Sequence, residues 1–381
     1  MLDRSEPTLA DGTPISSMVA DLTKEVSMRA LADPEIYRLE LERIFTKTWI
    51  CLGHDSELPE TGDYVVRNMG ADQVIVARGS DGDIHVSLNV CPHRGMRICS
   101  AEAGKAMVHR CVYHGWAFRP DGSFIGAPVE REKMHGDIFT KKELGLDKAR
   151  VALYGGLIFA TWNHDGPSLE DHMGEMKWYF DVLFNRSDNG LEVLQPPHRL
   201  LIPANWKAIG EQSANDGFHT LTLHRSIMEL GQMGVSTESI YDAAPGMYGV
   251  DIGHPTGHTA RCIPAEYTFQ NAQDMKVGDM SVQERIRILP PPGISPEMLP
   301  QLEKHLDEGQ IKMLAEHPPL TGSIFPTCFF LFLYVPMADG TMSSTIILHN
   351  FTPISIDQVE FQTWFLAEKD ASPEMKRQML A

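Results

Sequence analysis

The pattern of apolar and polar positions predicts a helix near the start of the chain, followed by short strands. In "DPEIYRLELERIFTKTWICLG" (33–53) apolar residues recur at helical spacing and the run ends in a glycine, which predicts an amphipathic helix leading into a strand. The segments "YVVRNM", "QVIVARG" and "IHVSLNV" are typical of strands, and "GSDGD" (79–83) predicts a hairpin turn between the last two. More short strands are expected around "AFRPDGSF" and "VALYGGLIFATW". Residues 39–160 are therefore expected to form a small all-β domain.

The pattern becomes mixed after residue 160. "SLEDHMGEMKWYFDVLF" has helical spacing, "HRLLIPANWKAIGEQSANDGFHTLTLH" changes from strand to helix, and "SSTIILHNFTPI" is an apolar strand. "CFFLFLYV" (328–335) is too short to cross a bilayer, so it predicts a buried strand. We expect an α+β fold in which residues 161–381 form a larger domain and residues 1–38 are its N-terminal segment.

Composition and charge narrow the class of protein. The 381 residues and the 43% hydrophobic content allow a large core and two or three domains. The opening "MLDRSEPTLADGTPISS" has no apolar run, so neither a secretory signal nor a membrane anchor is expected. Six cysteines in such a chain are typical of a reducing cytoplasm, where metal binding is a better use for them than disulfides. The net charge of −18 disfavours nucleic acid and anionic membranes as partners.

The segment 92–120 departs from this acidic character. It contains five bases and one acid, Glu102, which leaves an excess of four positive charges. The bases are Arg94, Arg97, Lys105, Arg110 and Arg119. Such a segment is either a solvated face or a docking patch for an acidic partner.

A cysteine and a histidine occur together twice, in "CPH" (Cys91, His93) and in "CVYH" (Cys111, His114). Four such donors in two loops can hold one tetrahedral zinc ion or a two-iron, two-sulfide cluster. Zinc sites usually pair cysteines as C-x2-4-C, whereas each loop here offers one Cys and one His. The spacing favours a Rieske centre, with both Cys on one iron and both His on the other, and zinc is the alternative.

The surroundings of the motif support two facing loops. Seventeen residues separate its first His from its second Cys, and Gly95 and Gly115 follow the two His, which leaves room for backbone N–H groups near a cluster. The remaining cysteines have no metal-like spacing and are expected in the core. They are Cys51, Cys99, Cys262 and Cys328.

A second candidate site lies in "NWKAIGEQSANDGFHTLTLH" (205–224). His219 and His224, preceded by Asp216, are plausible imidazole ligands for a 2-His-1-carboxylate Fe(II) site that leaves positions open for O2. Two His five residues apart lie about 140° apart on an ideal helix, so shared ligation predicts an irregular backbone there. Alone, the pair is more typical of two core or surface histidines, and the preceding Cys/His motif reverses that preference in favour of the metal interpretation. "HPTGH" (254–258) is expected to be a structural loop.

Together these motifs resemble the α subunit of Rieske non-haem iron aromatic-ring-hydroxylating dioxygenases, in particular the naphthalene and polycyclic-arene branch. The resemblance runs from about residue 33 to 376, through "ELERIFTKTWICLGHDSELPETGDYV", "LNVCPHRG", "CVYHGWAF", "ANWKAIGEQSANDGFH" and "AEKDASPEMKR". It implies an all-β Rieske [2Fe-2S] domain set into a catalytic domain with a curved antiparallel sheet and helices.

The resemblance also implies roles for the motif residues. Cys91, His93, Cys111 and His114 would ligate the cluster, and His219 and His224 would bind the mononuclear iron. Asp216 would be the bridging acid that receives an electron from the Rieske domain of a neighbouring subunit, by way of that neighbour's His114. The assembly would be an α3 trimer, or an α3β3 hexamer with a small β subunit.

The implied activity is the addition of both atoms of O2 to an aromatic ring, which gives a cis-dihydrodiol. The electrons would come from NAD(P)H through a reductase and a ferredoxin, because the chain has no GxGxxG or P-loop motif of its own. The basic segment 92–120 would receive the ferredoxin. A Rieske monooxygenase or O-demethylase, and a redox or binding protein without an intact catalytic iron site, are the alternatives.

Two departures from the family pattern stand out. Gln212 and Ser213 replace the Asn-Phe of many naphthalene-type relatives, and a smaller Ser213 is expected to admit a larger ring system. The family's third iron ligand, an aspartate, would lie beyond "AEKDASPEMKRQML", so the chain is expected to be truncated. A helix is expected to open there, with Ser372 as N-cap and Pro373 as its first residue. The late acids Asp357, Glu360, Glu368, Asp370 and Glu374 are expected at the surface.

Overall fold

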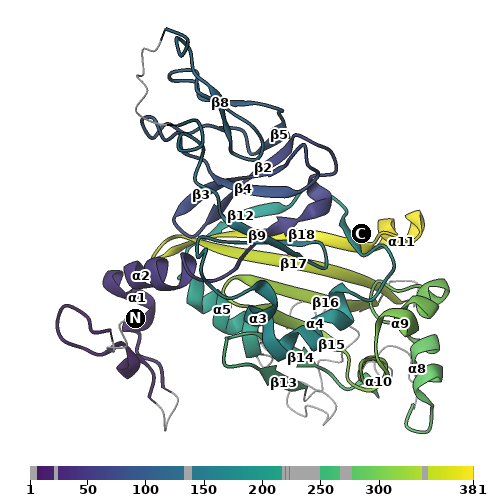
Figure 1. Cartoon of the computed structure of the whole chain (residues 1–381). Coiled ribbons are helices and arrows are strands. Elements are labelled where there is room, and N and C mark those ends of the chain that lie inside the picture. The colour runs from purple at the N-terminus through teal and green to yellow at the C-terminus, as the bar shows by residue number, and fades with distance from the viewer. Residues whose placement is uncertain are drawn as a thin grey trace.

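Three small antiparallel sheets occupy the region predicted to be all-β. The computed structural model describes residues 7–20, 25–132, 140–216, 219, 223, 249–266, 277–336 and 342–380. Within these ranges the small sheets have the strand orders β4-β3-β2-β5, β6-β7-β8 and β1-β10-β9. Their strands are β1 (Ile50–His54), β2 (Asp63–Met69), β3 (Asp72–Arg78), β4 (Ile84–Leu88), β5 (Ala103–Lys105), β6 (His109–Arg110), β7 (Ala117–Phe118), β8 (Phe124–Gly126), β9 (Arg150–Tyr154) and β10 (Leu157–Thr161). Figure 1 shows β2 to β8 at one end of the molecule.

The predicted hairpin turn and the predicted N-terminal helix are both present. The turn between β3 and β4 closes with a hydrogen bond from the Gly79 N–H to the Asp83 carbonyl, 2.8 Å. Asp33 caps α2 (Pro34–Glu40) by accepting from the Glu35 N–H, and proline starts the helix because its fixed φ suits the first helical position. A π-helical turn, Leu41–Phe45, follows α2 directly and leads toward β1. This short helical segment comes after α1 (Arg29–Ala32) and a 3-10 turn at Ile15–Met18.

The larger domain is built on one antiparallel sheet in the order β11-β18-β17-β16-β15-β14-β13, with β12 also paired to β18. Its strands are β11 (Leu191–Val193), β12 (His198–Ile202), β13 (Val250–Gly253), β14 (Thr259–Cys262), β15 (Pro319–Ile324), β16 (Cys328–Pro336), β17 (Met342–Ser355) and β18 (Gln358–Glu368). Its described helices are α3 (Leu169–Met173), α4 (Lys177–Phe184), α5 (Trp206–Asn215), α8 (Val282–Ile288), α9 (Leu299–His305), α10 (Glu308–Glu316) and α11 (Pro373–Leu380). The α+β fold class is therefore confirmed.

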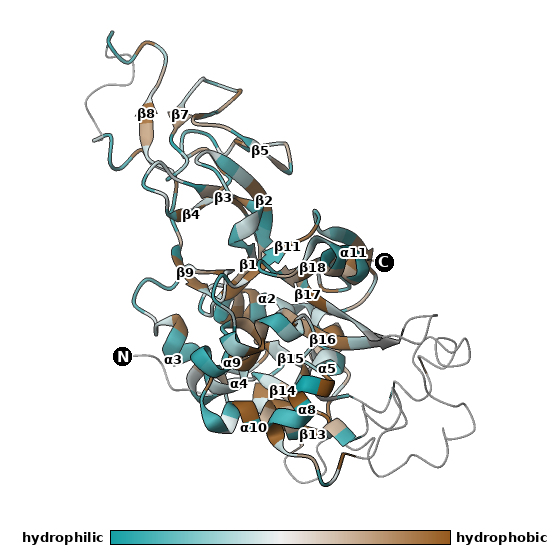
Figure 2. Cartoon of the chain, turned by 90° about the vertical axis from the view of Figure 1, so that its right-hand side faces the viewer, coloured by the Kyte–Doolittle hydropathy of each residue, from teal (hydrophilic) through white to brown (hydrophobic). Residues whose placement is uncertain are grey.

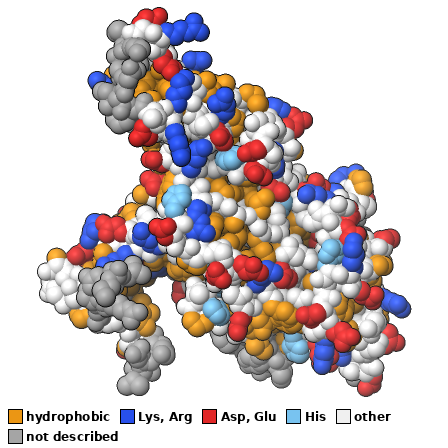
Figure 3. All heavy atoms as spheres, in the orientation of Figure 1, with side chains coloured by type: hydrophobic (Ala, Val, Ile, Leu, Met, Phe, Trp, Pro, Cys, Tyr) orange, Lys and Arg blue, Asp and Glu red, His pale blue; other side chains and the backbone are white. Residues whose placement is uncertain are grey.

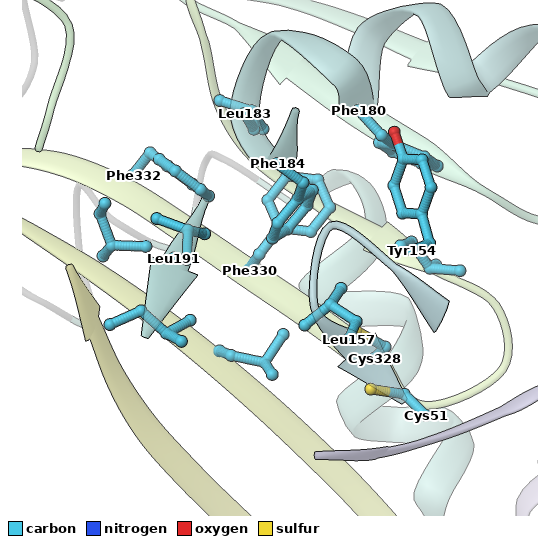
Figure 4. Close-up of a cluster of buried hydrophobic side chains, with 14 of the residues drawn as sticks. Cys51, Tyr154, Leu157, Phe180, Leu183, Phe184, Leu191, Cys328, Phe330 and Phe332 are labelled. Carbon is cyan, nitrogen blue, oxygen red and sulfur yellow. The ribbon is translucent and has the colours of Figure 1, made fainter. Parts of the chain in front are cut away.

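The two faces of the large sheet are covered differently. Phe330 and Phe332 of β16 pack under Phe184 of α4, in a buried cluster that also contains Cys51 and Cys328 (Figure 4). Successive residues of a strand point to opposite faces, so residues 329, 349 and 351 lie on the other side. There α5 packs closely, because a Cβ added at Gly210 would lie 3.5 Å from the Phe351 ring. Figure 2 accordingly shows α4 and α5 on opposite sides of β15.

Two details differ from the sequence expectations. The helical segment "SLEDHMGEMKWYFDVLF" is broken into α3 and α4 at Gly174, whose φ of 52° lies in the left-handed region. Glu360 and Glu368 are not surface acids, because both are buried in ion pairs, with Arg199 and Arg186 respectively.

The helix predicted to open at Ser372 is present as α11, with the Met375 N–H donating to Ser372 Oγ at 3.1 Å.

Candidate metal centres

The two Cys/His loops have the same backbone geometry. The Gly95 N–H donates to the Cys91 carbonyl and the Gly115 N–H to the Cys111 carbonyl, each at 2.9 Å. The Cys91 and Cys111 N–H groups in turn each donate 2.8 Å bonds, to the carbonyls of residues 96 and 116. Both glycines have positive φ, 71° and 74°, which L side chains rarely adopt. The glycines noted in the sequence therefore close two matching turns.

These turns bring the four predicted cluster ligands together as two pairs. The Cys91 and Cys111 side chains are buried and lie next to each other. The His93 and His114 rings lie with centroids 4.6 Å apart, nearer the surface. Burial raises the pKa of the Cys91 thiol, and the neighbouring Cys111 thiol raises it further. A bound metal is therefore needed to hold Cys91 as a thiolate at neutral pH.

The pairing fits a two-iron cluster better than a single zinc ion. A structural zinc site needs about four donors around one point. A Rieske cluster instead needs two thiolates on one iron and two imidazoles on the other, which is the arrangement of these loops.

The loops rest on a buried core of their own. The Trp116 ring stacks on His93, with centroids 4.8 Å apart and an interplanar angle of 2°. The Asn89 side chain holds the end of the first loop by accepting from the Cys99 N–H and donating to the Cys99 carbonyl, both at 2.8 Å. Cys51, Cys99, Cys262 and Cys328 are all buried and unbridged, as expected of core residues.

Cys99 has a partner that the sequence pattern did not reveal. Its Sγ lies 3.2 Å from Nδ1 of His109, and both side chains are buried. Burial raises the pKa of the Cys99 thiol to about 11 and lowers the pKa of His109. Both groups are therefore neutral at pH 7, and the pair is part of the core.

The surface around the ligand loops is both basic and apolar (Figure 3). Arg94, Arg97, Arg110 and Arg119 are exposed, and so are Val112 (75%) and Tyr113 (58%). Lys105 differs from the other bases because Glu60 and Asp63 pair with it. Its charge is largely neutralised, and the basic patch is made by the four arginines.

The second candidate site lies at the C-terminal end of α5. Asn205 caps the start of this helix by accepting from the Lys207 N–H, and the helix ends at Asn215. Asp216 Oδ1 accepts from the His219 N–H at 3.2 Å, and its Oδ2 lies 3.4 Å from His219 Nδ1. A carboxylate beside Nδ1 orients the ring, and a metal on Nε2 would replace the contact that Gln212 makes with that atom.

The structure places the other predicted residues of this site as follows. Gln212 lies on the last turns of α5, and its Nε2 is 3.0 Å from Nε2 of His219. Ser213 is buried beside it. His224 lies outside the described residues. The donor set that is described, an imidazole oriented by a carboxylate, suits Fe(II).

An aromatic surface lies on the sheet face that α5 covers. His349 of β17 stacks on Phe329, 5.6 Å between centroids, and lies 4.7 Å from Phe361. Its Nδ1 is 2.9 Å from the Thr363 hydroxyl, and burial lowers its pKa to about 4. The imidazole is therefore neutral. The sequence did not reveal this face, because the run "CFFLFLYV" of β16 is apolar throughout and shows no alternation.

"HPTGH" is structural, as expected. His258 is fully buried, its Nδ1 accepts from the Phe325 N–H at 3.0 Å, and its Nε2 lies 2.8 Å from the His172 carbonyl. Both ring nitrogens are thus used within the protein. Burial lowers the pKa of His258 to about 4.

Comparison with known proteins adds the family context. Residues 48–144 match the Rieske [2Fe-2S] domain, and residues 171–381 match the catalytic domain of the ring-hydroxylating alpha subunit. The chain is 33% identical to the biphenyl 2,3-dioxygenase subunit alpha of Rhodococcus jostii (strain RHA1), over 98% of this chain and 77% of that protein. It is 32% identical to the N,N-dimethyl phenylurea N-demethylase subunit alpha of Sphingobium sp. (strain YBL2), over 92% of this chain and 72% of that protein.

The fold is shared with solved structures as well. Naphthalene 1,2-dioxygenase from Rhodococcus sp., bound to indole, superposes with a TM-score of 0.79 at 32% identity, over 93% of this chain and 76% of that one. Over the described part of the chain, no helix has the length and apolar composition needed to span a bilayer.

Proposed function

This chain belongs to the ring-hydroxylating α-subunit family of Rieske non-haem iron dioxygenases, and from that premise we propose which of its residues carry the activity. It is an oxidoreductase that carries a Rieske [2Fe-2S] cluster and a mononuclear iron. When bound, the cluster supplies single electrons and the iron activates O2. The reaction joins an arene, O2, two electrons and two protons into a cis-dihydrodiol, so both oxygen atoms end on the ring.

We assign the cluster to Cys91, His93, Cys111 and His114, because their two matching turns present two thiols and two imidazoles as separate pairs. Trp116, stacked on His93, fixes the plane of one of these imidazoles. The supporting family match covers residues 48–144, within the segment 39–160 that we propose as the Rieske domain. Residues 1–38 and 161–381 would form the catalytic domain around it.

For the mononuclear iron we propose His219 and His224 as ligands and Asp216 as the residue that orients His219. The contacts of Asp216 with both the backbone N–H and Nδ1 of His219 are the observation that carries this assignment. Asp216 also stays 37% exposed, which suits a bridging role toward a neighbouring subunit. Its carboxylate would accept one hydrogen bond from His219 and one from the partner subunit's His114.

The substrate would lie between α5 and the aromatic face of the sheet. Gln212 and Ser213 lie toward the end of α5, and Phe329, His349 and Phe361 form an aromatic surface on the sheet face that this helix covers. A neutral His349 adds no charge there, so the surface suits an uncharged aromatic ring.

Electrons are proposed to reach the cluster from a ferredoxin and an NAD(P)H reductase. The exposed arginines next to the ligand loops suit an acidic donor protein. Arg97→Glu should slow reduction by ferredoxin and leave reduction by dithionite unchanged, while Lys105→Gln, at a base already paired with acids, should change neither. Equal ferredoxin rates for Arg97→Glu and the wild type would refute the docking patch.

A small β subunit, an α3 or α3β3 assembly and a cytoplasmic location are also proposed from the family resemblance.

The products decide between dioxygenase and demethylase. The similarity to an N-demethylase subunit alpha supports the second candidate, in which one oxygen atom oxidises an N-methyl group to formaldehyde and the other leaves as water. The chain, with a ferredoxin and a reductase, should be given naphthalene, biphenyl and N,N-dimethyl phenylurea under 18O2. A cis-dihydrodiol with two labelled atoms is expected. Formaldehyde without any diol would favour the demethylase.

A further inference from the structure

Glu40, at the end of α2, reaches across the molecule to the start of α5. Its side chain is buried, at 8% relative exposure. Oε1 lies 2.6 Å from Nζ of Lys207, and Oε2 accepts from the Trp206 indole N–H at 2.8 Å. Trp206 and Lys207 are the first two residues of α5. One carboxylate thus holds two consecutive residues of the helix, and Figure 1 shows α2 beside α5.

The contact is reinforced on both sides. Phe45, in the π-helical turn after Glu40, packs edge-on against the Trp206 ring, 5.1 Å between centroids. The Asn205 side chain, which caps α5, donates to the Ile356 carbonyl at 2.8 Å. The start of α5 is therefore fixed to the N-terminal helical segment and to the turn between β17 and β18.

The charges of Glu40, Lys207 and the α5 helix dipole interact at the start of α5. A lysine in the first turn of a helix is unfavourable, because the helix dipole places partial positive charge there. Glu40 offsets both the Lys207 ammonium and the dipole. A buried carboxylate without its partner is strongly destabilising, and Lys207 is itself only 24% exposed, so loss of either side chain perturbs the start of the helix.

The far end of the same helix presents the candidate iron site. Gln212 lies on α5, and Asp216 directly follows its last residue. A ten-residue helix is about 15 Å long, so a tilt of about 5° at its start moves its end by roughly 1.3 Å. Functional side chains have to be held within about 0.5 Å of their working positions. A small loss of order at Glu40 is therefore enough to misplace His219.

We propose that Glu40 is a positioning residue of the mononuclear iron site, acting through Trp206 and Lys207 on the orientation of α5. The inference rests on the proposed assignment of His219 as an iron ligand. It makes the affinity of the catalytic domain for iron depend on a side chain at the end of α2, inside the proposed Rieske segment 39–160 and far from the metal in the sequence.

The test is the dissociation constant for Fe(II), measured by anaerobic equilibrium dialysis of the full chain with its cluster in place. Glu40→Ala should weaken Fe(II) binding about tenfold, because a displaced His219 no longer holds the ion in its working position. The visible absorption of the cluster should stay as in the wild type. Glu42→Ala is the matched control, because Glu42 pairs with Arg38 at the surface, each 57% exposed, and its removal should leave the Fe(II) constant unchanged.

Two more variants separate positioning from general stability. Glu40→Gln keeps an acceptor for the Trp206 indole and leaves Lys207 without its countercharge, so it should also weaken Fe(II) binding. Adding Lys207→Met removes the unpaired charge and should restore binding toward the wild-type value. Recovery of Fe(II) binding in the double variant tests the positioning role even if Glu40→Ala does not fold.

The inference is overturned if folded Glu40→Ala binds Fe(II) as the wild type does, or if the Lys207→Met addition brings no recovery. His219→Ala, measured in the same series, tests the underlying assignment. Unchanged Fe(II) binding in His219→Ala would refute the ligand assignment itself. Lost binding in His219→Ala with wild-type binding in Glu40→Ala would refute the positioning role alone.

Discussion

Replacing Glu368 by glutamine should destabilise the large sheet strongly. Glu368 ends β18 and pairs with Arg186, with the Arg186 Nε 2.8 Å from its Oε1 and each side chain only 1% exposed. The Ser187 hydroxyl donates to the other carboxylate oxygen. The Arg186 guanidinium also lies over the Phe332 ring, 5.1 Å from its centroid. The pair therefore joins the end of β18 to the residues after α4.

The size of the effect follows from burial. Glutamine keeps the shape of the side chain and removes the charge, which leaves the guanidinium buried without a counterion. Breaking a buried pair in this way costs about 3–5 kcal/mol. A typical domain has roughly 5–15 kcal/mol of stability in total, so the loss is a large fraction of it. Removing both charges, with Arg186→Met and Glu368→Leu, should recover most of the loss, because an apolar pair avoids the desolvation penalty.

Native-state hydrogen exchange of the β17 and β18 amides is the suitable assay, since it reports the opening free energy of this sheet without assuming that the whole chain unfolds in one step. The matched control is Glu374→Gln on α11, whose partner Arg377 is exposed. That control should cost less than about 1 kcal/mol. An opening free energy for Glu368→Gln within about 1 kcal/mol of the wild type would refute the reasoning, as would a double variant no more stable than the single one.

Three further predictions concern the cluster, pH and substrate size. Cys111→Ser should abolish the acid-labile sulfide and visible absorption of the cluster, because one iron loses a thiolate, and unchanged sulfide would contradict the assignment. His258 has a pKa of about 6.5 in the unfolded chain and of about 4 in the folded chain. The folded state is therefore stabilised by the neutral His258 above about pH 6.5, and this stabilisation is lost as the pH falls toward 4. The stabilisation amounts to roughly 3 kcal/mol. The free energy of unfolding in urea should depend less on pH for His258→Asn than for the wild type, and an equal pH dependence would contradict this role of His258. Ser213→Phe should lower kcat/KM for three-ring arenes relative to naphthalene, and an unchanged ratio would exclude Ser213 from the pocket.

The parts of the fold that were predictable depend on local rules. The Gly79–Asp83 turn and the Ser372 cap of α11 each follow from a few neighbouring residues, and the structure contains both. The Cys/His motif was readable for a similar reason, since its spacing within each loop limits the metals it can hold.

The remaining contacts depend on long-range pairing that no local pattern encodes. Glu40 and Trp206 are 166 residues apart, and Arg186 and Glu368 are 182 apart, so neither pair has a spacing that can be recognised. Glu368 was expected at the surface for that reason, since an isolated glutamate near a strand end is usually exposed. The pair of Cys99 and His109 escaped notice because each residue looked like an ordinary core position.

The most direct test of the metal assignment is a count of iron, zinc and acid-labile sulfide per chain after anaerobic reconstitution. A Rieske cluster and a mononuclear iron together predict about two sulfides and about three irons per chain, without stoichiometric zinc. Zinc bound in place of iron, with no acid-labile sulfide, would contradict the account.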